Sequence, residues 1–284
     1  MSWIEFNKPF LKGEKPTKWR RLAVGSWGAP NNPTIYGIVE VNVEKALRSI
    51  EHHKKESGEK ITINHFVGKV FAQILKKYPE MNCELRMGKF YPRKNIDISF
   101  QVAIEHEHDH HPDLSAGLVQ NMDQKSIAEI ARDLNSFVKV IRKDHDPQFS
   151  GLKKLSGMIP GFMQTFAVAI LKFILNTLNL WSPIFGVPKN AFGSILVTSV
   201  GSLGLDLAIP ALFPPANVPM IIAVGAIFKG PVYETNHEGI VTQIKLERFV
   251  KLCGAFDHRY VDGMHASRFT RDIRYHFEHP ESWG

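Results

Sequence analysis

One histidine near the carboxyl terminus lies where a catalytic base could act. His258 occurs in the run AFDHRYVDGMHASRF, where the apolar residues up to Phe256 predict a strand and the polar residues that follow predict a turn. A strand end positions a side chain rigidly, while the loop after it exposes the side chain. An imidazole can take a proton from a thiol or an alcohol at neutral pH. The position therefore favours general-base chemistry, although most histidines are not catalytic and the chain has thirteen.

Two other polar groups lie close to His258 in the sequence. Asp262 and Gly263 precede the last predicted helix, where the Asp262 carboxylate can accept hydrogen bonds from the backbone of the first turn. Cys253 lies five residues before His258, so a cysteine nucleophile paired with the histidine is conceivable. Because Cys253 falls inside the predicted strand, a buried and inert thiol is favoured.

The elements that position these residues are predicted from apolar periodicity and from turn residues. Strands are predicted from Tyr36, from Asn95, near Ser194 and near Val218, with two more between Ile240 and Phe256. Helices are predicted to end at Gly58 and before Pro79, and to cover 123–144 and 264–280. We expect one α+β domain over 1–284, with an irregular amino-terminal arm (1–35) and an apolar insertion (151–190).

Composition narrows the class of protein. Hydrophobic residues make up 44% of the chain and charged residues 22%, as in soluble globular proteins. The net charge of +7 favours an anionic partner, but the basic residues are scattered, so nucleic acid ranks behind a nucleotide cofactor or a membrane surface. Two distant cysteines and an amino terminus without a secretory apolar run favour the cytoplasm.

A set of motifs in a fixed order carries a family resemblance. DHRxxDG around His258 resembles the catalytic domain of the acyltransferase component of 2-oxo-acid dehydrogenase complexes, and its HxxxDG core resembles the wider chloramphenicol-acetyltransferase-like superfamily. YGIVEVNVEKAL, ITINHFVGKVFAQILKKYPEMNCEL, NIDISFQVAIE, VTSVGSLG and IIAVGAIFKGPV are similar to further family segments, in the family's order. The resemblance implies a two-layer α+β sandwich with a mixed sheet and helices, assembled as a homotrimer.

The resemblance also implies a mechanism. His258 would deprotonate a thiol or hydroxyl, which attacks a thioester directly without an acyl-enzyme, and acyl-CoA would be a substrate rather than a tightly bound cofactor. A hydroxyl from a neighbouring subunit would stabilise the oxyanion, and it aligns with Thr198 or with the adjacent Ser199. Strand alternation should point only one of these two side chains into the site.

Further residues are implied as structural support of the site. Asp262 looks like the family's aspartate, which is thought to orient the site through an arginine, and Arg20 or Arg21 falls where the family has that arginine. Gly263 completes the motif. The alternative, in which Asp262 only caps its helix, is compatible with the first role.

Four departures limit what the resemblance implies, and three of them are as follows. No lipoyl domain, subunit-binding domain or hinged linker precedes Tyr36, so we expect a stand-alone enzyme. The end HPESWG lacks the leucine-rich tail linked to hollow cores, so assemblies beyond a trimer stay open. The family's substrate-facing loop is replaced by a run that could bind a transition metal, although a solvated hairpin without metal is favoured: Glu105, His106, His108, Asp109, His110 and His111.

The apolar insertion is the fourth departure. Its helical part is apolar nearly all round, except for a narrow polar stripe of Lys172, Asn176 and Asn179. Three alternatives remain: burial against the domain or a neighbouring subunit, a lid over an apolar acyl channel, or peripheral membrane contact through 156–183. The last two would imply a lipid-like acyl group or acceptor.

Three functions follow, of which the first is favoured. In the first, the chain would be a CoA-dependent acyltransferase with a small or lipid-like thiol or hydroxyl acceptor. Alternatively, it is a dihydrolipoamide acyltransferase that uses lipoyl groups carried by other chains. The third hypothesis, a non-catalytic trimeric scaffold, is disfavoured because a scaffold has no physical need for an exposed imidazole at His258.

Overall fold

The computed structural model describes residues 32–106, 109–144, 150–213 and 216–282. Contacts between residues divide the chain into two units, Met1–Pro33 and Thr34–Gly284, and the fold below is that of the second unit. Its main sheet has seven strands, in the order β1-β9-β7-β6-β4-β5 with β8 paired to β9. These strands are β1 (Thr34–Asn42), β4 (Ile98–His106), β5 (Asp109–Val119), β6 (Ile195–Ser199), β7 (Met220–Val224), β8 (Phe228–Thr235) and β9 (Val241–Asp257). Strands β2 (Cys83–Arg86) and β3 (Lys89–Pro92) form a separate hairpin.

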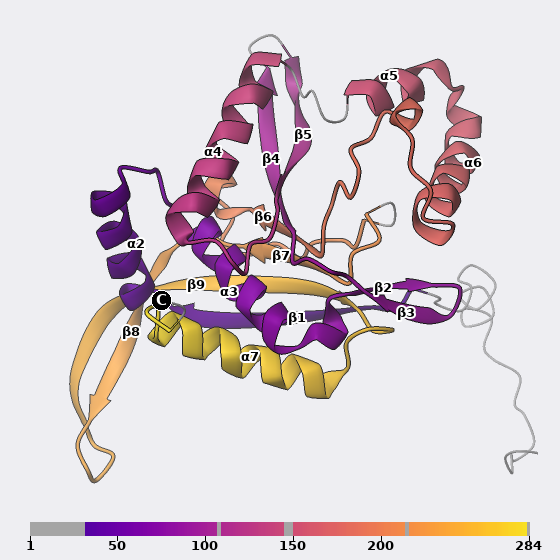
Figure 1. The fold of residues 1–284 in the computed structure, drawn as a ribbon. Coiled ribbons are helices and arrows are strands. Elements are labelled where there is room, and N and C mark those ends of the chain that lie inside the picture. The colour runs from indigo at the N-terminus through magenta and orange to yellow at the C-terminus, as the bar shows by residue number, and fades with distance from the viewer. Residues whose placement is uncertain (1–31, 107–108, 145–149, 214–215, 283–284) are drawn as a thin grey trace, which may run out of the picture. The chain divides into compact units, whose positions relative to one another are not determined.

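Four helices form a layer against this sheet: α2 (Glu44–Ser57), α3 (Ile63–Lys77), α4 (Ile127–Asp144) and α7 (Gly263–Glu278) (Figure 1). Buried residues of α3, α7 and the strands fill the space between the two layers, and the rings of Phe66 and Phe277 meet edge to face at 5.1 Å. Val197 of β6 belongs to this core, whereas Leu196 belongs to a second cluster. The two neighbours therefore mark the two faces of β6.

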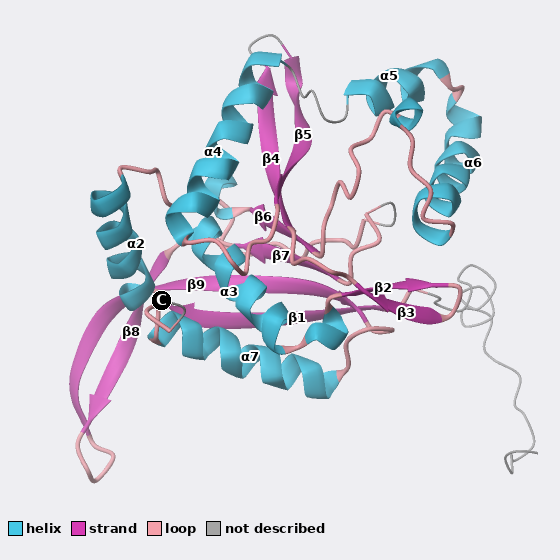
Figure 2. Cartoon of the chain, in the orientation of Figure 1, coloured by secondary structure: helices cyan, strands magenta, loops and turns pink. Residues whose placement is uncertain are grey.

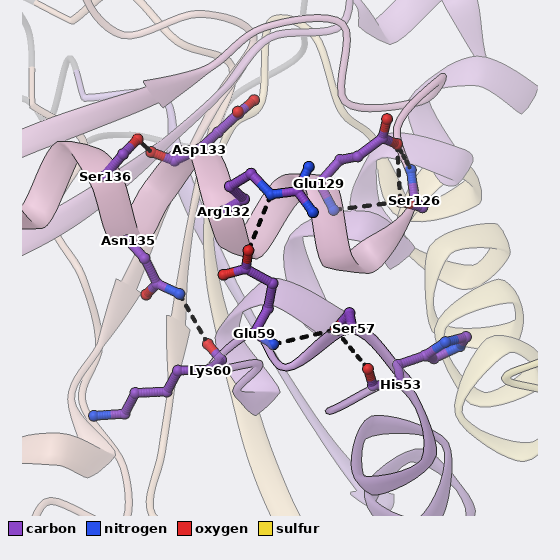
Figure 3. A network of polar contacts seen from close by, with 10 residues as sticks. All are labelled: His53, Ser57, Glu59, Lys60, Ser126, Glu129, Arg132, Asp133, Asn135 and Ser136. Atoms are coloured by element: carbon purple, nitrogen blue, oxygen red, sulfur yellow. Dashed lines mark hydrogen bonds and ion pairs between the residues drawn. The ribbon is translucent and has the colours of Figure 1, made fainter. Parts of the chain in front are cut away.

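The helix ends follow from local sequence. Gly58 ends α2 in the left-handed conformation, and Thr62 and His65 form a reciprocal cap at the start of α3. Ser126 and Glu129 form the same kind of cap at the start of α4, since the Glu129 carboxylate accepts from the Ser126 backbone N–H at 2.8 Å. Figure 3 shows how α4 is also tied to the α2–α3 connection, where Arg132 donates to Glu59 and Asn135 to the Lys60 carbonyl.

Strand β9 corrects one prediction. Val241–Asp257 is one strand of 17 residues, not two. No glycine, proline or asparagine lies between Thr242 and Cys253, so no residue favours a turn there. Its first half pairs with β8, and its second half lies between β1 and β7. One continuous element thus leads from the β8–β9 hairpin to His258 (Figure 2).

Two further differences concern neighbouring strands. The segment near Val218 forms β7 and then the start of β8, because the chain leaves the sheet between Gly225 and Ile227.

The polar run after β4 is not a loop: Asp109–Val119 forms β5, which pairs antiparallel with β4 from Ile98↔Val119 onward. Polar residues suit an edge strand, which exposes one side to solvent.

The apolar insertion forms helices α5 (Ser150–Met158) and α6 (Gly161–Lys172), followed by a π-helical turn over Phe173–Thr177 and a short 3₁₀ turn over Pro183–Phe185. Helices α4 and α6 lie on opposite sides of β4 and β5 (Figure 2). No residue of α6 is buried. Burial against its own domain is therefore not observed for α6, and burial against a neighbouring subunit stays a prediction.

Candidate active site

His258 lies in the turn directly after β9, and its side chain is exposed. Its Nδ1 is 2.8 Å from the carbonyl oxygen of Val261. A carbonyl oxygen only accepts, so Nδ1 carries the hydrogen and donates it. The Nε2 atom of the neutral ring then presents a lone pair to its surroundings. The local backbone thus selects the tautomer that a general base requires.

The residues on either side of His258 are joined to each other. The Arg259 guanidinium donates to both carboxylate oxygens of Asp257, from Nε to Oδ1 at 3.0 Å and from a terminal nitrogen to Oδ2 at 2.6 Å. The Asp257 side chain is buried, and this bidentate pair raises the pKa of Arg259. Arg259 thus holds the two sides of the His258 turn together.

Tyr260 ties the same turn to the β2–β3 hairpin. Its hydroxyl oxygen accepts from the Leu85 backbone N–H at 2.7 Å, and its ring packs edge to face on Phe90. Burial raises the pKa of Tyr260 to about 12, so the phenol stays protonated at neutral pH. Because the hairpin is a separate sheet, this bond fixes the His258 turn from outside β9.

Asp262 caps α7. Its carboxylate accepts from the His265 backbone N–H at 3.0 Å and is 2.8 Å from His265 Nδ1. The backbone hydrogen bond from His265 is the main cause that lowers the pKa of Asp262. Gly263 is the first residue of α7, and space around it is open. Arg20 and Arg21 lie outside the described residues, so the predicted arginine–aspartate pair stays a prediction.

Thr198 and Ser199 end β6 and line a cavity of about 1480 Å³. Alternation places Thr198 on the same face as Leu196, which is the cavity face, and places Ser199 on the face of Val197, which packs under the helices. Ser199 reaches the cavity as the last residue of the strand. Thr198 is thus the better placed of the two.

His258 and Thr198 lie at opposite ends of β7. Phe256, two residues before His258, pairs with Met220, whereas Thr198 pairs with Ala223. Five residue steps of a strand separate the two positions, which is about 17 Å. His258 also does not line the cavity that contains Thr198. The two side chains therefore do not meet within one chain, as the predicted site between subunits requires.

The cavity has one wall from the sheet and one from the insertion. Leu196, Thr198, Ile221 and Ala223 of β6 and β7 line it, as does the helical face Val168, Leu171, Lys172, Leu175, Asn176 and Asn179. The polar stripe predicted from spacing thus faces the cavity. Spacing alone gave the stripe but not the direction in which it points.

The remaining candidates carry no chemistry in the described structure. Cys253 is buried, and burial raises the pKa of its thiol, so the group stays protonated and inert. The side chains of 103–114 are not described, so the metal hypothesis for the histidine-rich run lies outside the described residues. Elsewhere in the described ranges, no group of three His, Cys, Asp or Glu side chains is arranged to hold a metal ion.

Comparisons with known proteins identify sequences that are similar to most of this chain. The family model for 2-oxoacid dehydrogenases acyltransferase (catalytic domain) matches residues 28–147 and 190–284, on both sides of the insertion. The lipoamide acyltransferase component of a branched-chain alpha-keto acid dehydrogenase complex from Bacillus subtilis (strain 168) is 29% identical over 246 residues, 85% of this chain and 46% of the relative. A dihydrolipoyllysine-residue acetyltransferase component of the pyruvate dehydrogenase complex from Rickettsia bellii is 22% identical over 87% of this chain and 48% of the relative. The chain spans about half the length of these relatives.

Solved structures confirm the predicted fold class. A probable dihydrolipoamide acetyltransferase from Listeria monocytogenes superposes with a TM-score of 0.60 and 24% identity, covering 94% of each chain. The cubic core of a pyruvate dehydrogenase multienzyme complex gives a TM-score of 0.62 at 18% identity, covering 100% of this chain and 98% of that one. A chloramphenicol acetyltransferase gives 0.50 at 13% identity, covering 86% and 88%. At these identities the likeness concerns the fold alone.

Proposed function

Because the chain belongs to the family of 2-oxoacid dehydrogenase acyltransferase catalytic domains, we propose that it transfers an acyl group between coenzyme A and a thiol or hydroxyl acceptor. The observation that carries the proposal is the His258 turn. It presents an exposed imidazole whose Nδ1 donates to Val261, which leaves Nε2 free to accept a proton.

The chemistry follows from these atoms. Nε2 of His258 takes the proton of the acceptor S–H or O–H, and the acceptor attacks the thioester carbonyl carbon of acyl-CoA. The carbonyl oxygen becomes an oxyanion, which accepts a hydrogen bond from the Thr198 hydroxyl of a neighbouring subunit. The tetrahedral intermediate then expels the CoA thiolate, which takes the proton from Nε2 of His258. The cycle leaves acylated acceptor, CoA and neutral His258.

The proposal requires more than one chain. Since about 17 Å of strand separates His258 from Thr198 in one subunit, the two groups can flank one thioester only if they come from different subunits. A homotrimer, as the sequence predicts, supplies three equivalent clefts of this kind. Larger assemblies are described for relatives, and the same is conceivable for this chain.

The acceptor has two candidates. A dihydrolipoyl group is supported by the names of the relatives, which are lipoamide or dihydrolipoyllysine acyltransferases. In that case the lipoyl group comes from another part of the protein or from another chain. A small or lipid-like acceptor is supported by the insertion, which adds a wall to the Thr198 cavity at the segment that the family model does not match.

The test measures acyl transfer from acetyl-CoA and longer acyl-CoA to dihydrolipoamide, to a lipoylated domain and to small alcohols. We expect His258→Ala to lower kcat by about 10²- to 10⁴-fold, because the proton acceptor is lost while an exposed side chain contributes little to folding. His237→Ala, at an exposed histidine of the β8–β9 turn, is the matched control. Equal turnover by wild type and His258→Ala would exclude the mechanism.

Two further readouts separate the candidates. Transfer only to lipoylated acceptors supports the dihydrolipoyl candidate, and transfer only to other acceptors excludes it. The scaffold hypothesis predicts that calorimetry detects no binding of coenzyme A to the wild-type protein.

A further inference from the structure

Helix α6 and the π-helical turn present one face to the cavity and another face to solvent. The face toward the cavity carries the polar side chains Lys172, Asn176 and Asn179. The outward face carries Phe162, Phe166, Ile170 and Phe173, which follow one another at spacings of four, four and three residues. The polar side chains of this helix thus face the cavity together with Val168, Leu171 and Leu175, while its phenylalanines face solvent.

The outward face is large and open. Phe162 is 87% exposed and Phe166 67% exposed, and other apolar side chains of the insertion that do not line the cavity are also exposed: Leu155, Met158, Met163, Leu178 and Ile184. We call these side chains, together with Ile170 and Phe173, the outer patch. A contiguous apolar surface on a soluble protein marks a place where another body binds.

The charge of the segment between Asp146 and Asp206 indicates which kind of partner binds the outer patch. No aspartate or glutamate occurs between Asp146 and Asp206, although the whole chain has 28 acidic residues. The same segment contains four lysines: Lys153, Lys154, Lys172 and Lys189. Lys154 and Lys189 are exposed. A segment without carboxylates, with lysines beside exposed Phe, Leu and Trp, has the composition of an element that lies in the interface of an anionic bilayer.

A second copy of the chain is the competing occupant of the outer patch. The family model matches the chain on both sides of residues 148–189 and not within them. The insertion therefore lies outside the segments that this chain shares with the family, so contacts between copies that are common to the family would not use the outer patch. A contact between identical copies also gives no reason to exclude carboxylates over so long a segment, whereas anionic headgroups repel them.

We propose that the outer patch docks the protein on the surface of an anionic lipid bilayer, with Phe162 and Phe166 inserted among the lipids and Lys154 at the headgroups. The insertion lies in the interface and does not span the bilayer: none of the helices that the structure describes is long and apolar enough to do so. The inference concerns a binding surface and does not depend on the acyl-transfer chemistry.

The first test is co-sedimentation of the full chain with vesicles of phosphatidylcholine alone and of phosphatidylcholine mixed with phosphatidylglycerol. Wild type should sediment with the mixed vesicles and much less with the neutral ones. Phe162→Ser/Phe166→Ser should weaken binding by at least about 10-fold. The control Met87→Ser/Met264→Ser removes two other exposed apolar side chains, which are 71% and 64% exposed, and should bind like wild type.

The second test addresses charge and the competing occupant. Lys154→Ala should weaken binding to the mixed vesicles by about 5-fold, and added salt should reduce the difference. Circular dichroism checks that each variant is folded, and sedimentation velocity checks its oligomeric state. Equal binding to both vesicle types, or none to either, overturns the proposal. A change of oligomeric state in Phe162→Ser/Phe166→Ser would instead assign the outer patch to a second copy.

Discussion

Asp257 and Arg259, on either side of His258 in the sequence, form a bidentate ion pair with two hydrogen bonds between the guanidinium and the carboxylate. The buried carboxylate ends β9, and the arginine is two residues further, so the pair closes the turn whose tip is His258. A bidentate pair fixes direction as well as distance. Asp257 and Arg259 are thus positioning residues for the proposed base.

Arg259→Lys should lower kcat by about 10-fold, because lysine offers a point charge in place of the planar fork and His258 then moves more freely. Arg248→Lys is the matched control, since Arg248 makes a similar pair with Glu44 on the distant half of β9, with bonds of 2.9 and 2.8 Å. Steady-state kinetics and thermal melts of both variants check the prediction. Equal kinetic effects of the two substitutions would show that the Asp257–Arg259 pair acts on stability alone.

Subunit mixing tests whether His258 and Thr198 act across an interface. His258→Ala and Thr198→Val should each be nearly inactive as pure proteins. If they are unfolded and refolded together in equal amounts, about a quarter of the clefts in a random trimer combine an intact His258 with an intact Thr198. Activity should therefore rise to about a quarter of the wild-type value. No recovery, with mixed trimers demonstrated by two different tags, would place both groups in one chain.

The two hydroxyls at the end of β6 should differ in their effects. Thr198→Val keeps the shape of the side chain and removes the donor, so kcat should fall by about 10²- to 10³-fold. Ser199→Ala should cost less than about 10-fold, because Ser199 shares the face of Val197 and not that of Leu196. KM for acyl-CoA should change little in either variant. The reverse order of effects would identify Ser199 as the oxyanion donor.

His65 should make stability depend on pH. Burial lowers its pKa from 6.5 to about 4, and Nδ1 accepts from the Thr62 backbone N–H at 2.9 Å, so the folded protein holds the ring neutral. As pH falls, the unfolded chain takes up this proton first. The stability that neutral His65 supports is complete above about pH 6.5 and is lost as pH falls toward 4, with a loss of about 2 kcal/mol by about pH 5.

Urea unfolding at pH 7 and pH 5 checks this prediction in wild type and in His65→Gln. Glutamine can still form the reciprocal cap with Thr62 but does not titrate. The variant should lose about 2 kcal/mol less than wild type between the two pH values. His237→Gln, at an exposed site, should keep the full wild-type dependence.

Much of the fold was predictable because its signals are local. The helix that ends at Gly58 and the strand from Tyr36 follow from periodicity and from one terminating residue, and both predictions agree with α2 and β1. The single strand β9 was harder, since no residue in it favours a turn and its two halves have different partners. Strand β5 was missed because its polar residues give no apolar alternation, and its partner β4 defines it.

The candidate site was likewise predictable from the sequence only where its signals are local. The position of His258 at a strand end was visible in the sequence, but the Nδ1–Val261 bond depends on how the turn folds back. The choice between Thr198 and Ser199 requires knowing which face of β6 the helices cover, which is a long-range property. The inward direction of the Lys172 stripe depends on which element lies beneath it, and a helix's own spacing does not contain that information.

The hairpin of β8 and β9 has a consequence for the whole assembly. Residues Val241–Arg248 pair only with β8 among the described strands, and Ile244 and Leu246 are exposed. This half of β9 has one partner strand among those described, so we expect contact with a neighbouring copy to stabilise it. Association of subunits would then stabilise the end of β9 that is far from His258. The same association would bring His258 and Thr198 together in one cleft. Dilution should therefore destabilise the β8–β9 hairpin and abolish acyl transfer over the same concentration range.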